Sequence, residues 1–82
     1  MPTTREDICC WFNHALQQDA THMIVATDTF DWSDYPVFVG RDADVASEIE
    51  RLRKQEMTMI TEVYNMTLPL EGQLAERRAF HL

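Results

Sequence analysis

The residues of this chain best suited to chemistry lie in one short stretch, residues 21–40, which is acidic and aromatic at once. Three carboxylates alternate there with three rings: Asp28, Phe30, Asp31, Trp32, Asp34 and Tyr35. Carboxylates keep such a loop in water, whereas aromatic rings gain free energy by leaving it. The conflict is resolved when the rings dock on their own domain or on a partner. The pattern therefore indicates a binding surface.

The same three carboxylates could gather around a hard cation such as Ca²⁺ or Mg²⁺, which prefers oxygen ligands. Their spacing differs from the EF-hand loop, which needs acids at alternate positions, a glycine and a distal glutamate. Residues 28–34 contain no glycine. Aspartates also cap turns and solvate loops without any ligand. We predict no metal and no cofactor, and two roles for these acids stay open, turn capping and partner binding.

Catalysis has weaker support in this sequence. The three histidines fall in three different expected elements and form no HxxxH, HExxH or Ser/His/Asp signature. Cys10 and His14 lie one helical turn apart, but the acids Glu6 and Asp7 disfavour the thiolate that a cysteine nucleophile needs. We predict that the protein is not an enzyme and has no catalytic residues. An enzyme that uses His22 or Cys10 ranks last among the alternatives.

Phosphate recognition is the best small-ligand alternative. The chain has only two glycines, too few for a glycine-rich phosphate cradle. Four arginines could still converge on a phosphate in the folded or oligomeric state: Arg41, Arg51, Arg77 and Arg78. The alternative function is therefore a nucleotide- or metal-binding module, in monomeric or oligomeric form.

The charge distribution points to a protein partner. The 82 residues carry a net charge of −7, and residues 19–50 alone hold eight acids and one base. Such a field repels nucleic acid and attracts basic proteins. Carboxylates along one face can imitate a row of phosphates, provided that the loop and the second helix share a side. The expected partner-binding residues are Asp28, Phe30, Asp31, Trp32, Asp34, Tyr35, Asp42 and Asp44.

Hydrophobic periodicity indicates the elements that hold the acidic loop. Thr3 and Glu6 form a capping box, and apolar residues at helical spacing then predict a helix over 4–18. A continuous apolar run predicts a strand at 21–27 that is buried on both faces. A second strand is expected at 35–39, antiparallel to the first across a wide loop. Pro36 cannot donate to a ladder, so this strand is expected to start at, or to lie along, an edge of the sheet.

The second half of the chain is expected to add two helices and one strand. Asp42 or Asp44 caps the second helix. Residues 57–66 fit either a strand or a continuation of that helix, and we prefer a strand because a two-stranded sheet is marginal alone. Pro69 suits the first position of a short last helix, and Phe80 is expected to pin the tail.

The order α-β-β-α-β-α predicts an α+β fold, with helices packed on a small, mainly antiparallel sheet. We expect residues 1–82 to form a single domain. No apolar run reaches the roughly 18 residues that cross a bilayer, and the polar first residues do not form a signal peptide. The expected location is the cytoplasm, without membrane contact. A chain of this size buries little surface, so homo-oligomerisation would be a natural supplement to its stability.

Two strings of this chain, THMIVATDTFDWSDYPVFV and EVYNMTLPLEGQLAERRAFH, resemble a group of short bacterial and phage proteins of unassigned function. The shared features are a THMIV-type strand, a DTF…DYPV loop and an EVY…LExQLxExRAFH ending. The resemblance covers residues 21–39 and 62–81 and implies no activity. It implies a phage or mobile-element setting, in which small acidic proteins bind host factors, including components of host defence.

These observations together predict a non-enzymatic, acidic protein-binding module. Its partner would be a host protein with a basic surface that handles nucleic acid, and the module would inhibit that protein. Direct contact with nucleic acid is not expected.

Overall fold

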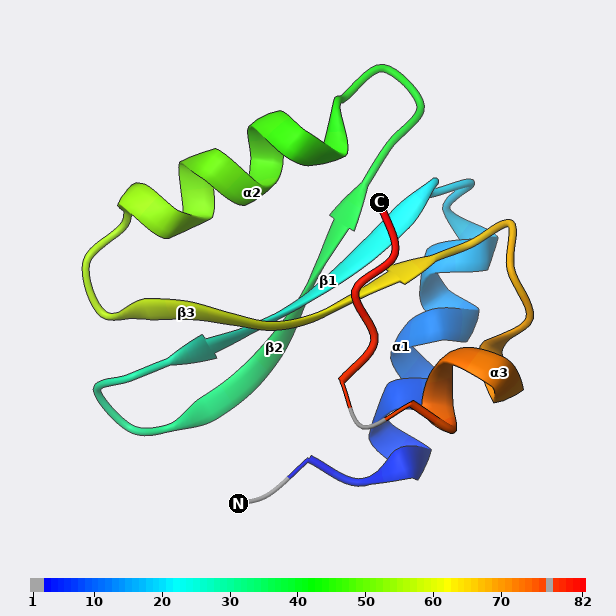
Figure 1. Ribbon diagram of the computed structural model, residues 1–82, viewed down its shortest axis with the longest axis horizontal. Helices are drawn as coiled ribbons and strands as arrows, with labels where there is room; N and C mark the ends of the chain where they lie inside the picture. The colour runs from blue at the N-terminus through cyan, green and yellow to red at the C-terminus, as the bar shows by residue number, and fades with distance from the viewer. Residues whose placement is uncertain (1–2, 77) are drawn as a thin grey trace.

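The computed structural model describes residues 3–76 and 78–82. It has the predicted α+β order (Figure 1): α1 (Arg5–Gln17), β1 (His22–Asp28), β2 (Ser33–Val39), α2 (Val45–Lys54), β3 (Thr58–Asn65) and α3 (Leu70–Leu74). The three strands form one antiparallel sheet in the order β2-β1-β3. Over the described part of the chain, no helix is long and apolar enough to cross a membrane.

β1 is the central strand of the sheet, and it is buried on both faces, as its apolar run predicts. Residues 23–26 are 0–1% exposed, because helices cover both faces of the sheet. β2 is an edge strand that contains Pro36, and this confirms the positional argument from the missing amide donor.

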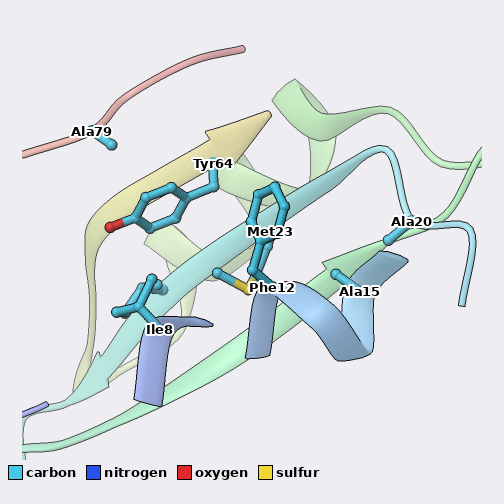
Figure 2. Packing of buried hydrophobic residues seen from close by; sticks show 8 residues of the cluster. Ile8, Phe12, Ala15, Ala20, Met23, Tyr64 and Ala79 are labelled. Carbon is cyan, nitrogen blue, oxygen red and sulfur yellow. The ribbon is translucent and has the colours of Figure 1, made fainter. Parts of the chain in front are cut away.

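Two small cores lie on opposite faces of the sheet. On one face, α1 contributes Ile8, Phe12 and Ala15, which pack with Met23 of β1 and Tyr64 of β3 (Figure 2). α3 adds Leu70 and Leu74 at the margin of this first core. The other core is built under α2 from Ile24, Val39, Ile49, Leu52 and Val63. The sheet is therefore the middle of three layers.

The start of α1 differs by one residue from the expectation. Thr4, not Thr3, is the N-cap, and the second member of the capping box is Asp7, not Glu6. The Asp7 amide donates to the Thr4 hydroxyl at 3.2 Å, and the Thr4 amide donates to the Asp7 carboxylate at 3.0 Å. An aspartate at this position reaches the cap amide as a glutamate would. The Thr3 hydroxyl instead donates to the carboxylate of Asp34.

Residues 58–65 form a strand, which confirms the preferred interpretation of the ambiguous segment. A β-bulge explains why the segment also fitted a helix. Val25 pairs with Glu62 and Ala26 pairs with Ile60, so Thr61 is the extra residue. Its hydroxyl donates to the Val25 carbonyl at 3.0 Å. The bulge places Ile60 and Val63 on the same face although they are three residues apart, a spacing that is otherwise typical of a helix.

The tail is held by the buried Ala79 and by its backbone, and Phe80, which is expected to pin the tail, is the residue that pairs with Val63. Ala79 is fully buried in the first core, whereas the Phe80 side chain is 46% exposed. The Val63 amide donates to the Ala79 carbonyl at 2.9 Å, and the His81 amide donates to the Val63 carbonyl at 3.0 Å. The tail therefore runs parallel to the outer edge of β3, with the small side chain of Ala79 buried against the core.

Candidate interaction surface

The acidic and aromatic loop is a tight turn between β1 and β2. Because β2 begins at Ser33, only residues 29–32 lie outside the strands, and the loop is shorter than expected. The Trp32 amide donates to the Asp28 carbonyl at 2.7 Å. Trp32 has a φ of 61°, which is uncommon for a residue with a side chain. The turn is therefore closed by a backbone hydrogen bond at Trp32, whose side chain is exposed.

Asp28 and Asp31 each cap this turn. The Asp28 carboxylate accepts from the Phe30 amide at 2.9 Å. The Asp31 carboxylate accepts from the amide and the hydroxyl of Ser33, at 3.0 and 2.7 Å. These two bonds lower the pKa of Asp31 because they stabilise its charged form. Both acids occur at the surface of the loop, so turn capping and an exposed negative charge coexist in the same side chains.

Asp34 has a different environment. It lies on β2 and is half-buried, and it accepts hydrogen bonds from the hydroxyls of Thr27, at 2.5 Å, and Thr3. Thr27 is itself only 4% exposed. The Asp34 carboxylate therefore connects the segment before α1 to the hairpin, and much of its hydrogen-bonding capacity is used within the fold.

Two of the three rings project into solvent. Phe30 is 77% exposed and Trp32 is 64% exposed, whereas Tyr35 on β2 is half-buried. Single exposed apolar residues are ordinary on protein surfaces. Two neighbouring large rings at one turn are a feature of interaction sites, because such rings lose unfavourable contact with water when a partner covers them.

Two methionines also lie at this end of the sheet, and the sequence analysis did not predict either of them there. Met57 is 53% exposed and Met59 is 42% exposed. The Thr29 amide donates to the Met57 carbonyl at 2.8 Å, and Met59 pairs with Thr27 of β1. In Figure 1 the β1–β2 turn and the α2–β3 connection meet at the left of the view. We call the exposed group of Phe30, Trp32, Met57 and Met59 the aromatic–methionine surface.

The sequence alone does not place the two methionines beside the turn, because their position depends on how β3 pairs with β1. The pattern MTM precedes the third strand, but only the register of that strand brings its first residues beside the hairpin turn.

Asp42 and Asp44 lie away from this surface. Both are exposed in the connection between β2 and α2, and β2 separates that connection from the hairpin turn (Figure 1). A seven-residue strand spans roughly 20 Å at about 3.3 Å per residue. Asp44 caps α2, and its carboxylate accepts from the amide and the hydroxyl of Ser47 at 3.3 and 3.1 Å. The eight expected residues therefore form two separate groups.

Two of the four arginines proposed for phosphate recognition each lie near an acid. Arg41 lies 3.9 Å from Asp19, and Arg51 lies 2.7 Å from Glu48, so these two arginines face different acids. Arg78 is exposed, and Arg77 lies outside the described residues. Among residues 3–76 and 78–82, no group of three or more histidine, cysteine, aspartate or glutamate side chains is arranged to hold a metal ion.

One polar hollow of about 270 Å³ lies between the N-terminal end of α1, β3 and α3. Its lining includes Arg5, Asp34, Glu62, Tyr64 and Glu76. The Tyr64 hydroxyl donates to Glu62 at 2.8 Å, and burial together with this carboxylate raises the pKa of Tyr64 well above its ordinary range. Tyr64 therefore stays a neutral donor, and the carboxylates of the hollow already have partners within the fold.

Comparison of this chain with known protein families, with curated proteins and with solved structures gives no match. The functional argument therefore depends on the geometry and charge of the chain's own residues.

Proposed function

We propose that this protein is a non-enzymatic binding module that engages a basic surface of another protein through its β1–β2 turn. One observation carries the proposal: the exposed rings of Phe30 and Trp32 stand beside the carboxylates of Asp28 and Asp31 on one ordered turn. The rings supply apolar contact area, and the carboxylates supply attraction to lysine and arginine side chains.

The order of the turn supports this function because binding then costs little conformational entropy. The backbone amides of Phe30, Trp32 and Ser33 already have acceptors within the turn. A partner therefore meets a turn whose backbone is held in place before contact, and preorganisation of this kind increases affinity. The net charge of −7 adds long-range attraction, which raises the association rate with a basic partner at low ionic strength.

The proposed setting is the cytoplasm of a bacterium, where the module inhibits a nucleic-acid-handling host protein on behalf of a phage or mobile element. This part of the proposal follows from the resemblance to short bacterial and phage proteins. The carboxylates of the turn would occupy positions that phosphates take in the target's groove. Asp42 and Asp44 would not extend the same row, because they lie at the other end of β2.

Affinity capture from bacterial lysate tests the proposal. The variant is Asp28→Asn with Asp31→Asn, because an asparagine oxygen still accepts the turn's amide bonds while the charge is removed. Asp34 is left unchanged since its carboxylate holds Thr3 and Thr27. We expect a basic protein to be retained at low salt and released at high salt, and we expect the double variant not to retain it.

Asp42→Asn with Asp44→Asn is the matched control, since it also removes two charges, at exposed positions away from the turn. Capture by the control should equal that of the unchanged protein. Equal capture by the double variant, or the absence of any salt-sensitive partner, would contradict the proposed function.

A further inference from the structure

We infer that the partner presents a basic amphipathic helix, and that Met57 and Met59 bind its apolar side while Asp28, Asp31 and Glu56 face its lysines or arginines. This inference rests on the proposed function and names the kind of partner segment. The reasons lie in the composition, the backbone bonding and the local charge of the aromatic–methionine surface.

Composition indicates an apolar ligand of variable shape. Two methionines and two rings are each exposed, and their backbones lie at the end of the sheet where the β1–β2 turn bonds to the start of β3. Methionine is unbranched and polarizable, so it adapts to apolar side chains of different outline. Methionine-rich surfaces of this sort accept the apolar face of a helix, which presents anchors at i, i+3, i+4 and i+7.

Backbone bonding at the surface argues against an added strand. A β-strand ligand requires free amide and carbonyl groups along a sheet edge. At this surface the Thr29 amide already bonds to the Met57 carbonyl, and the Trp32 amide bonds to the Asp28 carbonyl. The turn and the start of β3 therefore offer side chains, and a helix is a segment that is recognised through side chains. The free backbone groups of the sheet lie along the outer edge of β2, beyond the turn.

Charge indicates that the helix is basic. Residues 20–40 and 55–76, which include the three strands and the turn, contain no lysine or arginine. The acids nearest the exposed methionines and rings in the sequence are Asp28, Asp31 and Glu56, and all three are wholly or partly exposed. A second copy of this chain would bring a like-charged surface to the same place, which costs electrostatic energy. A basic helix complements both the apolar and the charged components.

The test uses three fluorescein-labelled peptides of equal charge and measures their binding by anisotropy. The first is an 18-residue peptide with leucines at helical spacing and lysines on the other face. The second has the same composition in scrambled order, and the third is oligolysine. We expect the amphipathic peptide to bind about tenfold more tightly than either of the others, because only it supplies apolar anchors on one face.

Met57→Gln with Met59→Gln should reduce the affinity for the amphipathic peptide about tenfold and leave its dependence on salt unchanged. Leu16→Gln is the matched control, since Leu16 is an exposed apolar residue on α1, and it should have no effect. Asp28→Asn with Asp31→Asn should instead reduce the salt dependence, because fewer charges are neutralised on binding.

A second measurement observes the unaltered protein. With ¹³C-labelled methionine methyl groups, the amphipathic peptide should shift the NMR signals of Met57 and Met59 and leave that of the buried Met23 in place. If the methionine variant binds as tightly as the unchanged protein, or if the Met57 and Met59 signals do not move, the inference is overturned. The proposed function would still stand if lysate capture required Asp28 and Asp31, so the two failures are distinguishable.

Discussion

Asp28, Asp31 and Asp34 have the same residue type and lie within seven positions, yet the fold uses them in different ways. Asp28 and Asp31 accept hydrogen bonds from the turn that contains them. Asp34 accepts from Thr27 and Thr3, which belong to other elements. The difference arises because Asp34 already belongs to β2, where it pairs with Thr27 of β1, so that the two side chains lie on the same face of the sheet.

Replacing Asp34 with alanine should therefore destabilise the protein. The buried hydroxyl of Thr27 would lose its acceptor, and an unsatisfied buried polar group costs about 1–3 kcal/mol of the free energy of unfolding. Asp31→Ala is the control, because Asp31 and its partner Ser33 are exposed, and it should cost less than Asp34→Ala. Urea unfolding measures both. Equal destabilisation by the two variants would show that the Asp34 contacts do not hold the segment before α1.

His22 links stability to pH. Its Nδ1 lies 3.0 Å from the Thr21 hydroxyl oxygen, and burial lowers the pKa of His22 below its ordinary value of 6.5 because the charged ring is poorly solvated. The unfolded chain therefore binds a proton at His22 near pH 6.5, whereas the folded chain binds it only at a lower pH. Stability rises with pH in that range, and this contribution is lost as the pH falls below about 6.5.

We expect the melting temperature of the unchanged protein to fall between pH 7.5 and pH 5.5, and to fall less for His22→Asn. Asparagine cannot take up the proton, so it removes this contribution while other titrating groups remain. The comparison is made by thermal unfolding followed by circular dichroism. An identical decrease in both proteins would mean that the titration of His22 is not linked to folding.

At the scale of elements, β3 shows how one local irregularity alters the pattern of a strand. The bulge at Thr61 places Ile60 and Val63 on the α2 side, and Glu62 and Tyr64 pack toward the other. Strict alternation of inward and outward side chains would have identified the segment as a strand. A bulge forms only when the strand pairs with a neighbour. The periodicity of the sequence alone is therefore compatible with both a helix and a strand.

The attachment of the C-terminal tail to the first core depends on a small residue. Ala79→Leu should destabilise the protein by about 1–3 kcal/mol, because extra methyl groups do not fit a closely packed site. Phe80→Ala should cost less, since much of the Phe80 ring is in contact with water. Chemical unfolding of the two variants measures the difference. If Phe80→Ala destabilised the protein more than Ala79→Leu, the result would support the expectation that this ring pins the tail.

At the scale of the whole molecule, the proposed binding surface depends on how the sheet is assembled. The turn between β1 and β2 and the start of β3 belong to segments almost 30 residues apart. They meet because β1 is central and pairs with both neighbours in antiparallel register. The same arrangement places the connection between β2 and α2 at the other end of the sheet (Figure 1). The acids therefore form two groups and not one row.

The sequence by itself determined the α-β-β-α-β-α order, the burial of β1 on both faces and the edge position of β2. These follow from local patterns: the apolar run at 23–26, the missing donor of Pro36 and the stripe of Ile49 and Leu52 on α2. It also identified the turn whose rings are exposed. Such features depend on periodicity and residue type, which a single segment carries in full.

Only the tertiary structure decided which acids share a surface, that Asp34 holds the segment before α1, and that two methionines join the exposed rings. Each of these depends on strand register, and register is a relation between segments distant in the chain. A shift of one residue would turn every side chain of a strand to its other face. No local pattern specifies such a relation, because packing on both faces of the sheet selects it.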